Sequence, residues 1–165
     1  MIFNAKGWAG LGIIAIISGA LSYTIYRHPV EVVYQNTDTP TSHDSQIVIG
    51  TSTLNVRVAR TNEEVTKGLS GTLSMNENEG MIFLFSVSDR YRFWMPDMHF
   101  GLDMIWIDES MKIVDISKNV PPLLDISKPI YYEPKTPARY VLEVHAGWSE
   151  RNNISIGESV RFKGI

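Results

Sequence analysis

The segment Trp8–Tyr26 constrains this chain more than any other feature. It reads WAGLGIIAIISGALSYTIY and contains no charged residue, so it matches the roughly 20 apolar residues that a helix needs to cross a bilayer. Lys6 precedes it and Arg27 follows it, and its tryptophan and tyrosines lie at its ends, where interfacial aromatic residues are common. We therefore expect a single-pass anchor in residues 1–27, with the membrane as a partner of residues 8–26 and the rest of the chain outside the cytoplasm.

A cleavable signal peptide is the alternative for the same segment. Ser18-Gly19-Ala20 supplies the small residues that signal peptidase accepts. Cleavage near Ala20 would give a secreted or periplasmic protein instead of an anchored one. Both alternatives export the domain that follows.

Charge and cysteine content exclude several classes of function. All 18 acidic residues but only 13 of the 15 basic ones lie after residue 27, so that part has a formal charge of −5. A surface with this net charge does not favour nucleic acid as a partner. The chain has no cysteine, which excludes disulfides, thiolate metal sites and a cysteine nucleophile.

A polar stretch separates the apolar segment from the predicted domain. Residues 28–45 include TDTPTSHD, a composition that cannot bury enough apolar surface to order itself, so we expect a flexible tether. The domain then occupies residues 46–165. It begins with the segments IVIG and LNVRVA, which show the alternating polarity of strands. Residues 50–53 separate them, so the two segments predict a hairpin. A short helix follows, because Thr61 and Glu64 match a capping box and Gly68 lies at the expected stop.

Turn residues recur every eight to twelve positions in the remainder, which is typical of a β-sandwich or barrel and not of alternating βα units. Five prolines between Asn119 and Pro137 deny the backbone the donors of a regular ladder and predict a long surface loop. The predicted strands are Met81–Ser86, Tyr91–Met95, Leu102–Asp108, Ile113–Ser117, Arg139–His145 and Ser159–Phe162.

Several sequence motifs resemble one family. In order, they are TNEEVTKGL with Thr61, Glu64, Gly68 and Leu69; EGMIFLF with Gly80 and Met81; FWM at 93–95; LDMIWID at 102–108; and YVLEVHAG at 140–147. Together they resemble the family named domain of unknown function 192, over Ile47–Phe162. The resemblance implies a single compact, mainly β domain of jelly-roll or barrel type, often behind an export signal or anchor, with no established activity.

The chain departs from the pattern of that family at three places. Ser70-Gly71 stands where the family usually has an arginine after its Gly-Leu, and Pro96-Asp97-Met98 stands where Phe-Trp-Met is usually followed by Lys-Asn-Thr. Gly101 replaces a proline before Leu102-Asp103. A polar pocket built on the usual arginine and asparagine would therefore be altered here.

Asp97, His99 and Asp103 are the first candidate site. Their even spacing would project all three from one face of an extended strand, where two carboxylates and an imidazole suit a divalent metal. Isolated aspartates beside glycine and proline more often bond backbone amides in turns. We favour the turn hypothesis, and predict neither a bound metal nor a cofactor.

Carboxyl groups offer a second kind of site. Asp97 and Asp103 are candidates for the acid pair of a glycoside hydrolase. Glu143 lies in the apolar strand 139–145 and would have a raised pKa if its carboxyl were buried. The alternative, which we favour, is an ion pair of Glu143 with Arg57 or Arg92. No serine can be placed beside His99 or His145, and no nucleophile elbow is present.

Aromatic residues offer a third kind of candidate site. Trp94, Tyr131 and Tyr132 could stack on a sugar ring if they line a groove, whereas Trp94 and Trp106 alternate with polar residues as core aromatics do. Trp148 falls in a predicted turn, and the two tyrosines of the proline-rich loop are the pair that we expect to be exposed.

Three hypotheses about function follow. The first is an envelope module that binds a glycan or another small polar ligand through Trp94, Asp97, His99, Asp103, Glu143 and the two tyrosines. The second is an interaction protein that docks on a membrane complex through the proline-rich loop. The third, a hydrolase that depends on carboxylates or a metal, needs two carboxyl groups at catalytic separation.

Overall fold

The computed structural model describes residues 45–165. The predicted anchor or signal (residues 1–27) and nearly all of the predicted tether (residues 28–45) lie outside the described residues. Within the described range, no helix is both long and apolar enough to cross a membrane.

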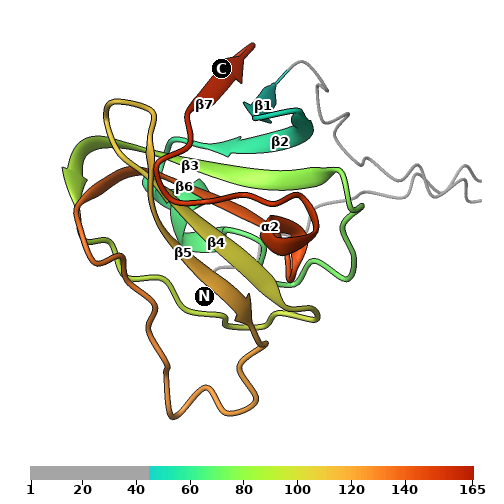
Figure 1. Ribbon diagram of the computed structural model, residues 1–165. Coiled ribbons are helices and arrows are strands. Elements are labelled where there is room, and N and C mark those ends of the chain that lie inside the picture. The colour runs from blue at the N-terminus through green and yellow to red at the C-terminus, as the bar shows by residue number, and fades with distance from the viewer. Residues whose placement is uncertain (1–44) are drawn as a thin grey trace, which may run out of the picture. The chain divides into compact units, whose positions relative to one another are not determined.

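Seven strands form one sheet in the order β5-β4-β6-β3-β2-β1-β7 (Figure 1). The mainly β prediction is confirmed, and two short helices accompany the sheet instead of one. The elements are β1 (Gln46–Ile49), β2 (Ser52–Ala59), α1 (Asn62–Lys67), β3 (Glu79–Asp89), β4 (Leu102–Ile107), β5 (Ile113–Val120), β6 (Ala138–His145), α2 (Trp148–Arg151) and β7 (Val160–Lys163).

Most neighbouring strands are antiparallel, but β2 and β3 are parallel, with Val56 opposite Gly80. A parallel pair needs a crossover, and α1 with the segment after it provides that connection. The sequence analysis missed this single βαβ-type unit because α1 has only six residues. Its capping box is confirmed: Glu64 N donates to Thr61 Oγ1, and Thr61 N donates to the Glu64 carboxylate.

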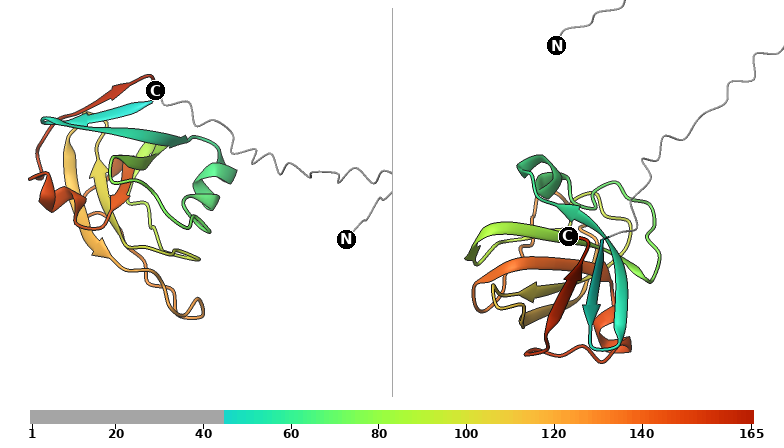
Figure 2. Two further views of the ribbon diagram at one scale, coloured as in Figure 1. Left: turned by 90° about the vertical axis from the view of Figure 1, so that its right-hand side faces the viewer. Right: turned by 90° about the horizontal axis from the view of Figure 1, so that it is seen from above.

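The sheet curls into a half-barrel, which Figure 2 shows from two sides. Its edge strands β5 and β7 approach each other at one end only. There Lys112 and Ser159 form an isolated bridge, and Ile113 N donates to Glu158 O over 3.0 Å. Of the expected jelly-roll or barrel-like domain, the structure confirms a mainly β domain whose single sheet curls into a half-barrel.

Both faces of the sheet are covered, so two separate clusters of buried side chains form. Every residue of β4 is buried, and its side chains alternate between the clusters. Ile105 and Ile107 belong to the inner cluster, which Trp148 also joins. Met104 and Trp106 belong to the outer cluster, which lies against α1 and the segments that flank β4.

Three local predictions are corrected by the structure. The hairpin turn between β1 and β2 comprises only Gly50 and Thr51. The predicted strand Tyr91–Met95 is wrong, because only Phe93 bridges to another segment, at Tyr132. Trp148 begins a helical turn and is 5% exposed, so it is a core residue and does not lie in an exposed turn.

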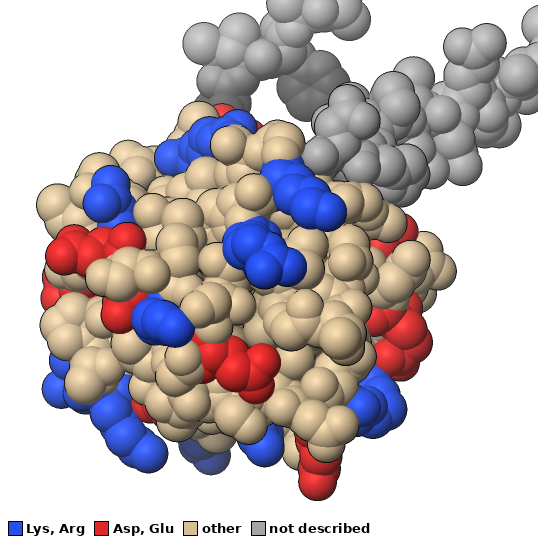
Figure 3. Space-filling model, turned by 45° about the horizontal axis from the view of Figure 1, so that its top comes forward, with Lys and Arg blue, Asp and Glu red and all other residues tan. Residues whose placement is uncertain are grey.

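Charges of both signs are distributed over the surface. On the face in Figure 3, Lys and Arg side chains are interspersed with Asp and Glu side chains. Ion pairs between described residues include Arg90–Glu133 (2.6 Å), Arg151–Glu77 (2.5 Å) and Lys128–Asp125 (3.8 Å). All three are exposed, so each contributes little to the free energy of unfolding.

Candidate functional site

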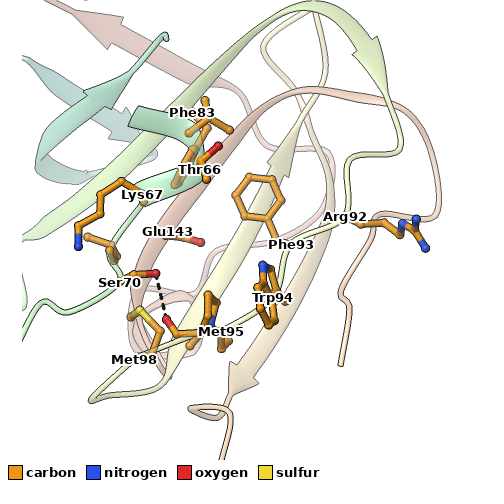
Figure 4. A pocket seen from close by; sticks show the side chains of 14 residues that line it. Thr66, Lys67, Ser70, Phe83, Arg92, Phe93, Trp94, Met95, Met98 and Glu143 are labelled. Atoms are coloured by element: carbon orange, nitrogen blue, oxygen red, sulfur yellow. Dashed lines mark hydrogen bonds between the residues drawn. The ribbon is translucent and has the colours of Figure 1, made fainter. Parts of the chain in front are cut away.

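A cavity of about 260 Å³ lies on the outer face of the sheet (Figure 4). Three parts of the chain form it: α1 with the residues after it, the segment that precedes β4, and the sheet itself. Its lining residues are Val65, Thr66, Lys67, Gly68, Leu69, Ser70, Phe83, Arg92, Phe93, Trp94, Met95, Pro96, Met98 and Glu143.

Short contacts fix the two walls of this cavity. Gly68 ends α1 with φ of 47°, a backbone conformation that favours glycine, and this residue lies against the Phe83 ring of β3. Ser70 Oγ donates to Pro96 O over 2.9 Å, and Gly71 N donates to Asp97 O over 2.8 Å. The segment after α1 is therefore tied directly to the segment before β4.

Glu143 is the only acid among the lining residues. Glu143 lies on β6, opposite Met81 of β3 and Met104 of β4, and is 5% exposed. Within residues 45–165, no hydrogen bond or ion pair reaches its carboxyl group. Burial raises the pKa of Glu143 to about 8, and the charge of Arg57 opposes this rise. At pH 7 the carboxyl is therefore mostly uncharged and can both donate and accept a hydrogen bond.

The predicted ion pair of Glu143 with Arg57 or Arg92 is wrong. Arg57 is opposite Met81, which is in turn opposite Glu143, so a whole strand separates the two charged groups. The Arg92 guanidinium lies 5.2 Å from the centre of the Tyr131 ring, and Figure 4 shows it directed away from Glu143.

Aromatic rings form much of the apolar wall. The Phe93 ring meets Phe83 edge-on at 4.9 Å between centroids and Trp106 at 5.6 Å. Trp106 itself is fully buried, as the core hypothesis predicts. Trp94 is 38% exposed and its ring lies 6.2 Å from that of Tyr131. One side of the cavity is therefore built on the core, and the other reaches solvent.

Asp103 takes a structural role away from the cavity. It is fully buried, and its carboxylate accepts hydrogen bonds from Asn119 N (2.8 Å) and Gly147 N (3.0 Å), and from both Ser149 N (2.9 Å) and Ser149 Oγ (2.6 Å). This carboxylate joins the end of β5 and the start of α2 to β4. The preference for backbone amides that we expected of isolated aspartates is observed here, although Asp103 lies within a strand.

The metal hypothesis gains no support from the described part of the chain. Asp97 and His99 are exposed and lie in the segment before β4, whereas Asp103 is buried. No group of three or more potential metal ligands gathers within residues 45–165. The two-carboxylate mechanism also lacks a partner acid at the cavity, because neither Asp97 nor Asp103 lines it.

The two loop tyrosines differ from each other. Tyr131 is 49% exposed, as predicted for the pair. Tyr132 is half-buried and pairs with Phe93 through two backbone hydrogen bonds. Of the predicted site residues, the cavity brings together only Trp94 and Glu143, with Tyr131 beside Trp94.

Most of the cavity lining was missed by the sequence analysis. Thr66, Lys67, Phe93 and Met95 all lie in the motifs TNEEVTKGL and FWM, which were recognised for their resemblance to a family and not as a site. These residues share one sequence signal, which is that they belong to motifs in common with the family. In the structure the two motifs line the same cavity, together with the buried acid Glu143.

Comparison with solved structures gives two similar chains. One is a protein from Sinorhizobium meliloti described as a candidate transcription regulator, with 25% identity and a TM-score of 0.65; the match covers 73% of this chain and 93% of that one. The other is a protein of unknown function from Novosphingobium aromaticivorans, with 28% identity, a TM-score of 0.64, and coverage of 71% and 82%.

No curated protein matches the chain. The model of the family DUF192, described as an uncharacterised ACR, matches residues 45–162. This range contains all seven strands except the last residue of β7, and every residue that lines the cavity. The chain therefore belongs to the DUF192 family.

Proposed function

We propose that this domain is a binding module for a small polar ligand, about the size of one sugar ring, in the cell envelope. One observation carries the proposal: Glu143 is buried, has no partner among the described residues, and lines a cavity. No side-chain oxygen within residues 45–165 is both sealed from solvent and without a partner, so the Glu143 carboxyl opens into the cavity. A ligand that enters the cavity can therefore form the hydrogen bond that the described residues do not supply.

The size and lining of the cavity set the kind of ligand. Its volume of about 260 Å³ lies just below the roughly 300–1,000 Å³ of typical small-molecule sites. Phe93 and Trp94 present apolar surface for the face of a ring, while Ser70 and Thr66 place hydroxyl groups nearby. A molecule with both an apolar face and hydroxyl groups, such as a monosaccharide unit, fits this lining.

Positions at which this chain departs from the usual family pattern meet at the cavity. Ser70 replaces the usual arginine, and Pro96 and Met98 belong to the segment that replaces Lys-Asn-Thr, and all three residues line the cavity. Two of the three departures of this chain thus lie at the cavity, whereas Gly101 does not line it. This supports a shared binding fold whose ligand varies between members.

The envelope location rests on the sequence. The uncharged segment Trp8–Tyr26 is what an anchor or signal requires, and the binding domain would then act outside the cytoplasm. A hydrolase is less well supported, because a glycosidase needs two carboxyl groups and the cavity lining supplies one.

Isothermal titration calorimetry with residues 45–165 tests the proposal. Glucose, glucosamine and glucuronate share one ring and differ in charge, so they also report on Lys67 and Arg92 at the cavity. We expect at least one to bind, and the affinity of a neutral ligand to fall as the pH rises through about 8, because Glu143 then loses its donor proton.

Two variants serve as controls. Glu143→Gln keeps an uncharged hydrogen-bonding group, so its affinity for the neutral sugar glucose should not change between pH 6.5 and 9.5. Glu150→Gln changes an exposed acid of α2 and should behave as the unmodified domain does. Binding of any of these sugars that persists unchanged in a folded Glu143→Ala variant would place the ligand elsewhere and overturn the proposal.

A further inference from the structure

We propose that the loop between β5 and β6 docks on an anionic lipid bilayer, with the aliphatic side chains at its tip in the interfacial layer. The aliphatic tip lies outside the cavity, although Trp94 and Arg92 near the base of the loop also line it, and the inference does not depend on the cavity ligand. The loop projects from the body of the domain in Figures 1 and 2. It is fixed at its base, where Leu123 N donates to Met95 O and Tyr132 pairs with Phe93, so residues 124–130 form the projecting part.

The projecting part exposes large aliphatic side chains. Leu124 is 99% exposed, Ile126 71% and Ile130 56%. At the base of the loop, the rings of Tyr131 and Trp94 are 49% and 38% exposed. Aliphatic residues at the tip with tyrosine and tryptophan behind them reproduce the order in which side chains enter a bilayer through its interface.

The charges around the loop favour anionic lipid. Each acid of the loop has a basic partner, because Asp125 pairs with Lys128 and Glu133 with Arg90. Lys118, Lys135 and Arg92 form no ion pair within residues 45–165, and the Arg92 guanidinium lies over the Tyr131 ring. Cations without an ion-pair partner among the described residues thus lie near the base of a loop whose tip is apolar, in a domain whose overall charge is negative. This combination is characteristic of segments that lie on anionic membranes.

Asp125 sets the depth of insertion. Its carboxylate accepts hydrogen bonds from Ser127 N (3.0 Å) and Ser127 Oγ (2.7 Å), which fixes a turn between Leu124 and Lys128. A carboxylate is costly in the hydrocarbon layer, so the tip remains at the level of the headgroups, and Leu124 and Ile126 on either side of Asp125 provide the apolar contact.

The rest of the chain brings a bilayer within reach. Trp8–Tyr26 has the length and composition of a membrane span, and residues 28–45 reach at most about 60 Å when fully extended. A domain of this size is about 35 Å across. The loop can therefore contact the membrane that the same chain would enter.

Vesicle binding by residues 45–165, without the apolar segment, tests the inference. These residues contain both clusters of buried side chains, and the Sinorhizobium meliloti protein, 93% of which is covered by its match to this chain, has this fold on its own. The probes are vesicles of phosphatidylcholine alone and of phosphatidylcholine with phosphatidylglycerol. Binding is followed by co-sedimentation and by tryptophan fluorescence, which would report on Trp94 because Trp106 and Trp148 are buried.

We expect binding to the anionic vesicles, with a blue shift, and weaker binding at high salt or to the neutral vesicles. Leu124→Ser with Ile126→Ser should reduce the affinity by about tenfold or more, since interfacial binding scales with buried apolar area. Ile156→Ser is the matched control: Ile156 is 59% exposed and lies between α2 and β7, so this variant should bind as the unmodified domain does.

Three results would overturn the inference. The domain could fail to bind anionic vesicles, which would leave a protein partner for the loop. The double variant, with an unchanged melting temperature, could bind as well as the unmodified domain. The Ile156→Ser control could lose as much affinity as the double variant, which would show general adhesion and no specific role of the loop.

Discussion

Two carboxyl groups are buried on neighbouring strands of the same sheet, and their surroundings are opposite. Asp103 of β4 accepts four hydrogen bonds, whereas Glu143 of β6 accepts none from residues 45–165 and lines a cavity. The register places Asp103 opposite Val144 and Met104 opposite Glu143, so the two acids are directed to different faces. The comparison teaches that burial alone does not give an acid its role: Asp103 stabilises the fold, while Glu143 costs stability and is available to a ligand.

The variant that should change the free energy of unfolding most is Asp103→Ala. Three backbone amides and one hydroxyl would lose their acceptor inside the protein, and each buried donor left unpaired costs roughly 1–3 kcal/mol. We expect the free energy of unfolding, measured with urea, to fall by about 4–6 kcal/mol. A loss below about 1 kcal/mol would show that water replaces the carboxylate and that Asp103 is dispensable.

Glu143→Gln should raise the free energy of unfolding, by less than Asp103→Ala lowers it, and by an amount that depends on pH. The unfolded carboxyl ionises near its ordinary value of 4.5, but the folded one keeps its proton until about pH 8. The unmodified domain is therefore relatively most stable below pH 4.5, loses stability as the pH rises to about 8, and loses no more above it.

The variant lacks this titration, so by pH 9 it should exceed the unmodified domain by up to about 4 kcal/mol, and by little at pH 4.5. Urea unfolding at several pH values measures the difference. A constant difference between the two proteins across this range would mean that Glu143 ionises normally in the folded state.

The part of the cavity wall formed by α1 can be destabilised without a substitution at Asp103 or Glu143. Thr61→Ala removes the hydroxyl that caps α1, and loss of an N-cap costs about 1 kcal/mol. Because α1 and the residues after it line the cavity, we expect this modest loss to be accompanied by weaker binding of the cavity ligand, measured by calorimetry. Thr53→Ala, on the exposed side of β2, is the control and should leave binding unchanged.

The smallest expected effect concerns the influence of Arg57 on Glu143. Its charge lowers the pKa of Glu143 against the effect of burial, so Arg57→Gln should move that pKa upward from about 8. A carbon-13 NMR titration of the Glu143 carboxyl measures this shift. Arg161→Gln, on the exposed side of β7, should not change the titration; a downward shift with Arg57→Gln would contradict the electrostatic account.

Much of the sheet could be predicted from the sequence because its strands alternate in polarity or run as short apolar segments. Leu102–Asp108, Ile113–Ser117 and Arg139–His145 correspond to β4, β5 and β6 within a few residues. Tyr91–Met95 looks like a strand for the same reason, since its aromatic side chains suit a sheet. Phe93 is instead packed by tertiary contacts between Phe83 and Trp106, while Trp94 stays 38% exposed.

The site was predicted only in part. Glu143 was a candidate because an acid within an apolar strand is unusual, and the structure places it at the cavity. Its lack of a partner could not be predicted, because that depends on Met81 and the rest of β3 separating it from Arg57. The cavity walls meet through the contact of Ser70 with Pro96, which joins residues 26 positions apart without any local sequence signal.

The pairing of the first strand with the last has a consequence for how the domain is made. β1 lies between β2 and β7, and Ser45 Oγ donates to Gly164 O over 3.0 Å. A chain that is still being synthesised therefore has β1 with one unpaired edge until residues 160–163 have been added. The sheet can be completed only after β7 has been synthesised, so folding of this domain finishes late in synthesis whatever order its other strands form in.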